Sequence, residues 1–298
     1  MHQKLVARHK LIIKTDHMKE IFLNDGNKLP VVGFGTYKAT EQEGIEAVKF
    51  ALENGYRLLD TAAKYNNEEA VGKGIKLSGV PREEIKVTTK LWRENLSYEE
   101  AKSEFETSLQ KLELEYIDLY LIHWPANAKN YDNWQHANAE AWRAMEDLQT
   151  EGKIKSIGVS NFWPEHLEAL IKTARVLPAI NQIEFHPGYW QPEVTSYCKA
   201  KKITVQSWSP LGRGEILNND ILKSIAKKHK TTVAKVCLRW VTQHDVIVIP
   251  KSTTQERIKE NIDIFSIELT PEEIQQINAI PKLGYSGEHP NLWPDRES

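Results

Sequence analysis

Residues 85–123 read "IKVTTKLWRENLSYEEAKSEFETSLQKLELEYIDLYLIH" and contain one complete repeat of the pattern that decides the fold. Two strand-like runs, at 85–90 and 117–124, flank a segment at 97–112 whose apolar residues recur with helical spacing. Strands separated by a helix of this length indicate a parallel βαβ unit, in which helices cover the sheet on both faces. The number of such units therefore decides between an open sheet and a closed barrel.

The same alternation extends through nearly the whole chain. Strand-like runs fall at 31–36, 57–61, 85–90, 117–124, 154–161, 179–186, 203–209 and 246–252. Helical patterns lie between and after them, at 41–55, 67–79, 97–112, 138–153, 164–175, 192–201, 220–230 and 232–244. Eight strands in such an arrangement match a (β/α)8 TIM barrel. The rival is a doubly wound dinucleotide-binding sheet, but "GFGTYK" at 33–38 lacks the third glycine of the G-x-G-x-x-G motif.

The two ends of the chain complete this picture. Asp25-Gly26 between two short apolar runs predicts an N-terminal β-hairpin. No linker composition divides the chain, so we expect residues 18–298 to form a single barrel domain. Residues 1–17 are basic and precede a second methionine, and we expect them to be a disordered extension outside the fold. The tail "GYSGEHPNLWPDRES" at 284–298 has the composition of a surface loop.

Composition excludes several classes of partner. The 298 residues carry a net charge of -2, which disfavours binding to nucleic acid or to an anionic membrane. No apolar run approaches the roughly 18 residues that a membrane span requires. Cys198 and Cys237 both fall in predicted helices, which indicates buried thiols in a reducing compartment rather than a disulfide framework. We expect a cytoplasmic protein without a metal site, and a monomer is the default for this type of barrel.

Ionisable side chains gather where three consecutive predicted strands end. The carboxyl ends of barrel strands open onto one mouth, so Asp60, Lys90 and His123 should converge, with Tyr65 five residues after Asp60. A phenol has a pKa near 10 and needs help to exchange a proton at neutral pH. The Lys90 cation supplies that help, and Asp60 keeps the buried lysine charged. His123 adds a second hydrogen bond to an oxygen poised at the phenol, so these four residues are the candidate catalytic group.

A second group of polar residues follows the last predicted strand. The stretch "IPKSTTQERIKEN" at 249–261 opens a short helix and supplies Lys251, Ser252, Thr253, Arg257 and Asn261. Barrels often bind phosphate with the loops after strands seven and eight and with the N-terminus of a short extra helix. "SPLGRG" at 209–214 adds glycine-containing backbone that can approach a diphosphate closely. The pattern predicts a bound phosphate group.

At these residues the sequence resembles the aldo-keto reductase family, from about Lys19 to the C-terminus. "LLDTAAKYNNE" at 58–68 is similar to the family's motif around its aspartate and tyrosine, "KLW" at 90–92 to its lysine strand, and "LIHWP" at 121–125 to its histidine strand. "GVSN", "NQIEFHP" and "IPKS" followed by an arginine and "EN" complete the pattern. One mild departure is Asn66, where many members have glycine. The resemblance implies a (β/α)8 barrel capped at its bottom by the N-terminal hairpin.

The resemblance also implies a reaction and a cofactor. Tyr65 would be the general acid in an NADPH-dependent reduction of aldehydes and ketones, tuned by Lys90 and Asp60, while His123 orients the substrate carbonyl. A lysine and an arginine around a 2′-phosphate favour NADPH over NADH. The implied cofactor-binding residues are Gly35, Thr36, Ser160, Asn161, Gln182, Trp208, Ser209, Leu211, Gly212, Lys251, Ser252, Thr253, Arg257, Glu260 and Asn261.

Substrate choice is less readable from the sequence. The substrate-pocket walls implied by the resemblance are the aromatic residues Tyr37, Trp92 and Trp124. The remaining wall should come from the loop at 127–136 and from the tail, where Trp134, Tyr285 and Trp293 are candidates. Such walls suit hydrophobic or aromatic carbonyl compounds and also stack on sugars. The expected partner is a small carbonyl substrate.

Two other functions are compatible with these residues. Lys90 at a strand end could form a Schiff base, as in an aldolase, if it were uncharged. Asp60 argues against this reading because it holds the lysine as a cation. The same barrel could instead bind NADPH without catalysis and regulate a partner, although retention of all four ionisable residues disfavours such a sensor.

Overall fold

The computed structural model describes residues 19–292. It begins with an antiparallel hairpin of β1 (Glu20–Phe22) and β2 (Lys28–Pro30), which turns around Gly26 at a positive φ of 87°. The predicted hairpin is therefore confirmed. The predicted extension at 1–17 and the candidate pocket residue Trp293 lie outside the described residues.

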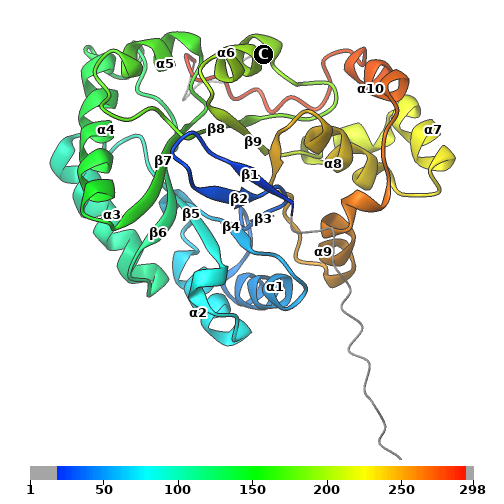
Figure 1. Cartoon of the computed structure of the whole chain (residues 1–298), viewed down its shortest axis with the longest axis horizontal. Coiled ribbons are helices and arrows are strands. Elements are labelled where there is room, and N and C mark those ends of the chain that lie inside the picture. Colours follow the sequence, from blue (N-terminus) through cyan, green and yellow to red (C-terminus); the bar gives the residue numbers. More distant parts are fainter. Residues whose placement is uncertain (1–18, 293–298) are drawn as a thin grey trace, which may run out of the picture.

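Eight parallel strands follow the hairpin and close into a barrel (Figure 1). They are β3 (Phe34–Gly35), β4 (Leu58–Asp60), β5 (Lys86–Leu91), β6 (Ile117–Ile122), β7 (Ile154–Ser160), β8 (Ile180–Glu184), β9 (Thr204–Trp208) and β10 (Ile247–Val248). Each strand pairs with the next along the chain. Parallel bridges from Val32 to Val248 and from Gly35 to Lys251 join the first strand to the last. The (β/α)8 prediction is confirmed, although several strands are shorter than the apolar runs that predicted them.

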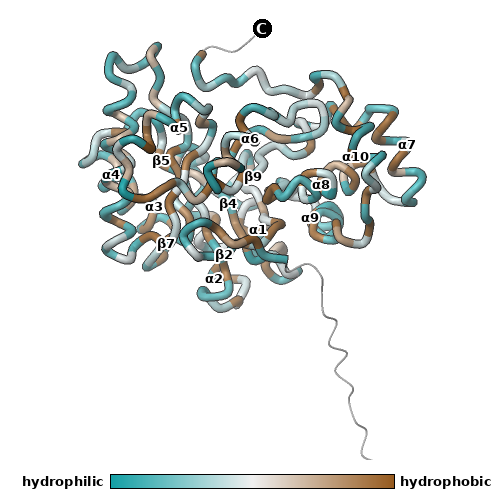
Figure 2. The backbone as a smooth tube through the Cα atoms, turned by 45° about the horizontal axis from the view of Figure 1, so that its top comes forward, coloured by the Kyte–Doolittle hydropathy of each residue, from teal (hydrophilic) through white to brown (hydrophobic). Residues whose placement is uncertain are grey.

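Helices surround the barrel. Figure 2 shows that hydrophobic (brown) and hydrophilic (teal) residues alternate along the backbone. The helices are α1 (Glu41–Glu53), α2 (Glu68–Ser78), α3 (Tyr98–Leu112), α4 (Trp134–Thr150), α5 (Pro164–Ile171), α6 (Pro192–Ala200), α7 (Asp220–Lys228), α8 (Val233–Gln243), α9 (Gln255–Ile262) and α10 (Pro271–Asn278). The sequence reasoning missed α10, although Thr270 and Glu273 form a capping box around its first turn and Pro271 opens it. Helix α4 also begins four residues before the predicted start, at an N-cap provided by Asn133.

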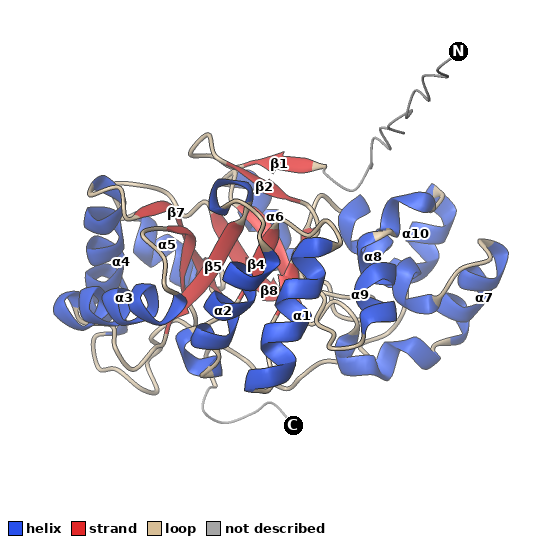
Figure 3. Ribbon diagram, turned by 90° about the horizontal axis from the view of Figure 1, so that it is seen from below, coloured by secondary structure: helices blue, strands red, loops and turns tan. Residues whose placement is uncertain are grey.

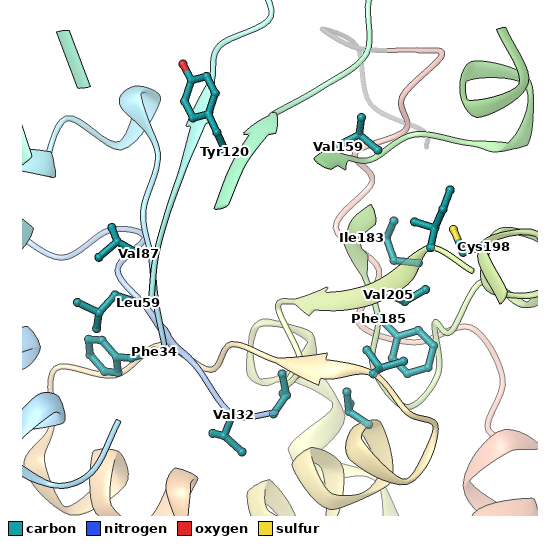
Figure 4. Packing of buried hydrophobic residues seen from close by; sticks show 14 of the residues in the cluster. Val32, Phe34, Leu59, Val87, Tyr120, Val159, Ile183, Phe185, Cys198 and Val205 are labelled. Carbon is teal, nitrogen blue, oxygen red and sulfur yellow. The ribbon is translucent and has the colours of Figure 1, made fainter. Parts of the chain in front are cut away.

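Alternation along the strands separates two apolar regions. Leu59, Val87 and Val159 belong to the large core cluster that packs around the strands, part of which Figure 4 shows. A smaller cluster contains strand residues of the opposite alternation together with the hairpin: Leu23, Leu29, Leu58, Leu119, Leu121, Ala179, Ile180 and Ile247. The hairpin therefore closes one end of the barrel, as the side view in Figure 3 shows.

The same alternation positions the candidate site at the other end. Asp60 follows the inward residue Leu58 by two positions, and His123 follows Leu121 by two. Along these strands, the side chains that point into the barrel are therefore apolar at first and ionisable at the carboxyl end. Within residues 19–292, none of the helices combines the length and the apolar character that crossing a bilayer requires.

Candidate active site

Lys90 stands at the centre of the ionisable group. Its side chain has no exposed surface, and its Nζ donates to Asp60 Oδ1 at 2.6 Å and to the Thr61 carbonyl at 2.8 Å. A longer contact of 3.4 Å joins Nζ to the hydroxyl of Tyr65. The structure thus brings Asp60, Lys90 and Tyr65 together as the strand order predicted.

A short 3-10 helix, Ala63–Tyr65, carries the phenol back toward the lysine. The chain then turns at Asn66, which has a left-handed φ of 53°. Glycine adopts this conformation most easily and asparagine tolerates it, so the replacement of glycine here has a physical reason. Asn67 holds the turn, because it accepts from Thr61 Oγ1 at 2.7 Å and donates to the Thr36 carbonyl at 2.8 Å.

Burial dominates the electrostatics of this group. It raises the pKa of Tyr65 well above the ordinary value, and the negative charge of Asp60 adds to the effect. Burial also lowers the pKa of Lys90, while the charge and hydrogen bond of Asp60 oppose that decrease. The sequence suggested that the lysine would ease ionisation of the phenol, but in this structure burial outweighs it. Tyr65 is therefore a neutral hydroxyl at neutral pH, and its raised pKa by itself makes it a weaker proton donor than a free phenol.

His123 lies on the other side of the phenol. Its ring is 5.5 Å from the ring of Tyr65 and 5.3 Å from that of Trp92, both in edge-on arrangements. Burial, followed by the positive charges of Lys90 and Lys64, lowers its pKa well below 6.5. Within residues 19–292, its buried Nδ1 has no hydrogen-bond partner. A neutral imidazole beside the phenol can share a substrate oxygen with it.

Polar side chains of β7, β8 and β9 extend this site. Gln182 donates to Asp60 Oδ2 at 2.7 Å, and Trp208 Nε1 donates to Asn161 Oδ1 at 2.8 Å. Asn161 Nδ2 in turn donates to the His123 carbonyl at 3.0 Å and to Ser160 Oγ at 3.1 Å. These predicted cofactor-binding residues are therefore hydrogen-bonded to the ionisable group, through the Asp60 carboxylate and the His123 carbonyl.

Two further groups of predicted cofactor residues lie nearby. Ser209, Leu211 and Gly212 lie in the turn after β9, where Gly212 N donates to the Ser209 carbonyl at 2.8 Å. Gly35 N donates to the Pro250 carbonyl at 3.0 Å, and Thr36 Oγ1 donates to the Asp60 carbonyl at 3.0 Å. These contacts place the first strand against the last and beside the ionisable group.

The predicted phosphate-binding residues surround the start of α9. Lys251, Thr253 and Arg257 are exposed, and Ser252 is buried with its hydroxyl accepting from Thr254 N at 3.0 Å. Within residues 19–292, neither Lys251 nor Arg257 forms an ion pair, although the charge of Lys251 acts at longer range on Glu43 of α1. Two further predicted residues lie in the same helix. Asn261 is buried, and Glu260 accepts a short hydrogen bond from the hydroxyl of Thr232 at the start of α8.

The aromatic residues predicted to line the substrate pocket differ in their exposure and in their contacts. Tyr37 is 49% exposed and its ring lies 4.9 Å from that of Tyr65, and Trp92 packs edge-on against His123. Trp124 is buried. Trp134 begins α4 and contacts His166 of α5 at 5.3 Å, so it packs between two outer helices.

The tail contributes to the site mainly through polar residues that the sequence reasoning did not single out. Ser286 donates its N–H and its hydroxyl to the carboxylate of Glu184, at 3.0 and 2.7 Å. Glu288 pairs with Arg213 of the loop after β9 at 3.0 Å. A shallow pocket that includes Glu184 and Glu288 is also lined by Asn161, Trp163, Ile183, Tyr189, Gln191, Trp208 and Pro290.

Comparison with known proteins agrees with this geometry. A protein-family model described as "Aldo/keto reductase family" matches residues 31–282. Over 270 residues the chain is 48% identical to a glyoxal reductase of Bacillus subtilis (strain 168), which covers 90% of this chain and 95% of that protein. It is 42% identical to the methylglyoxal reductase DkgA of Escherichia coli (strain K12), over 92% of this chain and 97% of that one.

A solved structure extends the comparison to three dimensions. The structure of Bombyx mori aldo-keto reductase (AKR2E4) in complex with NADP superimposes with a TM-score of 0.85 at 37% identity, and covers 94% of this chain and 97% of that chain. Neither the Schiff-base reading nor the regulatory reading finds support among these relatives, which are named as reductases. The chain belongs to the aldo/keto reductase family.

Proposed function

We propose that this protein reduces aldehydes and ketones to alcohols with NADPH, and that Tyr65 is the general acid of the reaction. The observation that carries the proposal is the buried Asp60–Lys90 pair, whose ammonium group lies 3.4 Å from the hydroxyl of Tyr65. A neutral phenol held next to a cation can donate its proton and have the resulting negative charge stabilised. The glyoxal and methylglyoxal reductases among the relatives support small dicarbonyl compounds as the first substrates to try.

The polar residues around the site fit the proposed cofactor. The exposed cations of Lys251 and Arg257 lie at the start of α9 without carboxylate partners in the described part of the chain, which suits a 2′-phosphate. The side chains of Ser160, Asn161 and Gln182 would hold the nicotinamide amide, and the indole of Trp208 offers a surface for its ring. When bound there, NADPH would supply the hydride for the carbonyl carbon.

The chain's own residues would supply the remainder of the chemistry. Tyr65 donates its hydroxyl proton to the carbonyl oxygen, and neutral His123 donates a hydrogen bond that orients the same oxygen. Lys90 stabilises the negative charge left on the phenol, and Asp60 keeps Lys90 protonated despite burial. The rings of Tyr37 and Trp92, which pack against Tyr65 and His123, would form a wall beside this oxygen.

Assembly and location are part of the same proposal. We propose that the enzyme acts as a monomer in the cytoplasm, on small carbonyl compounds and without a nucleic-acid or membrane partner. The buried free thiols of Cys198 and Cys237 support a reducing compartment. Size-exclusion chromatography with light scattering would test the monomer, and a mass of two or more chains would contradict it.

The test of the function is NADPH oxidation followed across aldehydes, ketones, keto-sugars, glyoxal and methylglyoxal. We expect turnover of several members of the panel, with NADPH used in preference to NADH. Binding of NADPH without reduction of any carbonyl would favour a regulatory barrel instead. Covalent trapping of a carbonyl substrate on Lys90 by borohydride would favour the aldolase, but Nζ already contacts three oxygen atoms and has no exposed surface.

A further inference from the structure

Lys64 immediately precedes Tyr65 in the 3-10 helix and is exposed at the mouth of the barrel. We infer that Lys64 is a specificity-determining residue, which favours carbonyl substrates that carry a carboxylate or phosphate group at the end remote from the carbonyl. This inference rests on the proposed function, because it concerns substrates of the same site. It assigns a role to a residue outside the ionisable group of Asp60, Tyr65, Lys90 and His123.

The position of the side chain carries the inference. Lys64 Nζ lies 4.7 Å from the centre of the Trp92 ring, and the same indole packs edge-on against His123 at 5.3 Å. One aromatic side chain therefore separates the ammonium group from the imidazole that would bind the substrate oxygen. A substrate that lies along Trp92 with its carbonyl at His123 would extend its other end toward Lys64. A para-substituted benzaldehyde carries its carbonyl and its second group at opposite ends of one ring, so it can probe this arrangement.

The charge of Lys64 is available to a ligand. Within residues 19–292, no carboxylate lies within ion-pair distance of its Nζ, and its aromatic contact with Trp92 leaves the ammonium group exposed. Carboxylates on the other side of the mouth already have partners, since Glu288 pairs with Arg213 and Glu184 accepts from Ser286. The positive charge also reaches His123, because it contributes to the lowered pKa of that imidazole. The Trp92 side of the site therefore carries the exposed positive charge of Lys64.

A lysine stacked on an aromatic ring is common on protein surfaces and is not by itself a binding site. Lys201, for example, lies 5.6 Å from the ring of Tyr197 at the end of α6. Lys201 precedes β9, whose carboxyl end faces the site, so it lies at the opposite end of the barrel. Lys201 is therefore the matched control for Lys64, with the same contact and charge away from the mouth.

The experiment compares two aldehydes that differ in charge but hardly in shape, 4-carboxybenzaldehyde and methyl 4-formylbenzoate. The measured quantity is the ratio of their kcat/KM values for the wild-type enzyme and for each variant. We expect Lys64→Gln to lower the ratio of acid to ester about 5-fold, which corresponds to about 1 kcal/mol for an exposed ion pair. Lys64→Glu should lower the ratio further, Lys64→Arg should preserve it, and Lys201→Gln should leave it unchanged.

High salt concentration should reduce the preference of the wild-type enzyme for the acid, because exposed charges are screened. The inference is overturned if Lys64→Gln and Lys64→Glu both keep the wild-type ratio, or if Lys201→Gln changes the ratio as much as they do. A wild-type enzyme that reduces neither aldehyde nor any other carbonyl compound would instead overturn the proposed reductase function, and this inference with it. Turnover of the ester by every variant separates these two failures.

Discussion

Replacement of Tyr65 by phenylalanine is the sharpest test of the proposed site, because it removes one hydroxyl and little else. The phenylalanine ring keeps the neighbours of the tyrosine ring, Tyr37 at 4.9 Å and His123 at 5.5 Å. The hydroxyl contact with Lys90 is long, at 3.4 Å, whereas Lys90 retains its bonds of 2.6 and 2.8 Å to other oxygen atoms. The free energy of unfolding should therefore fall by at most about 1 kcal/mol.

The loss of activity should be far larger than the loss of stability. General acid catalysis contributes a factor of about 10² to 10⁴, so kcat should fall by that factor. Each tenfold loss corresponds to about 1.4 kcal/mol in the activation barrier. Stopped-flow single-turnover measurement of NADPH oxidation would give the chemical step directly, and quenching of tryptophan fluorescence would give the Kd of NADPH.

Two results would refute the assignment of Tyr65. A variant that retains more than about a tenth of the wild-type rate would show that another group donates the proton, since positioned general acids contribute at least about 100-fold. A large increase in the Kd of NADPH would show that the hydroxyl serves the cofactor instead. Thermal unfolding of the variant is the control, because a large loss of stability would invalidate the comparison of rates.

Three further predictions concern the neighbouring charges. Asp60→Asn leaves the Lys90 ammonium buried without a counter-charge, so urea unfolding at neutral pH should show that the free energy of unfolding falls by about 3 to 5 kcal/mol. The free energy of unfolding should then recover as pH rises toward 10.5, because the folded state releases a lysine proton that the unfolded state keeps. A loss that does not depend on pH would contradict the role of charge. Arg257→Ala should raise the Kd of NADPH by at least about tenfold, because it removes one charge-assisted hydrogen bond. The Kd of NADH should hardly change. Equal increases in the two Kd values would contradict the binding of the 2′-phosphate by Arg257. The pH profile of kcat/KM should show no inflection near pH 6.5, because the pKa of His123 lies well below 6.5 and the imidazole is neutral just below and just above that pH. An inflection near pH 6.5 that disappears in His123→Asn would show that the imidazole titrates in the normal range.

Regular elements with strong local patterns were predictable from the sequence. The strand at 117–122 is buried at every position and the helix at 98–112 has a capping box at Ser97, so both have signals within a single window. The short strands Phe34–Gly35 and Ile247–Val248 were harder to delimit, because their ends are set by the closing bridges between them. Helix α10 carried a readable capping box that was overlooked.

The candidate site likewise has one part that could be predicted from the sequence and one part that could not. Asp60, Lys90 and His123 could be predicted because each ends a strand, and barrel geometry forces strand ends together. The contacts of the tail could not, since Ser286 reaches Glu184 across 102 residues and Glu288 reaches Arg213 across 75. Loops and tails lack a periodic pattern, so the sequence indicates only that they are polar and exposed.

By itself, the sequence determined the number of βα units, the end of the barrel at which the ionisable residues gather, and the basic residues that follow the last strand. Only the tertiary structure decided how those residues are protonated and which charges remain unpaired. Burial raises the pKa of Tyr65 although a lysine stands beside it, and Lys64 keeps an exposed charge where Arg213 has a partner. The physical reason is that periodicity is a local property, whereas solvation and ion pairing depend on neighbours that only folding brings into contact.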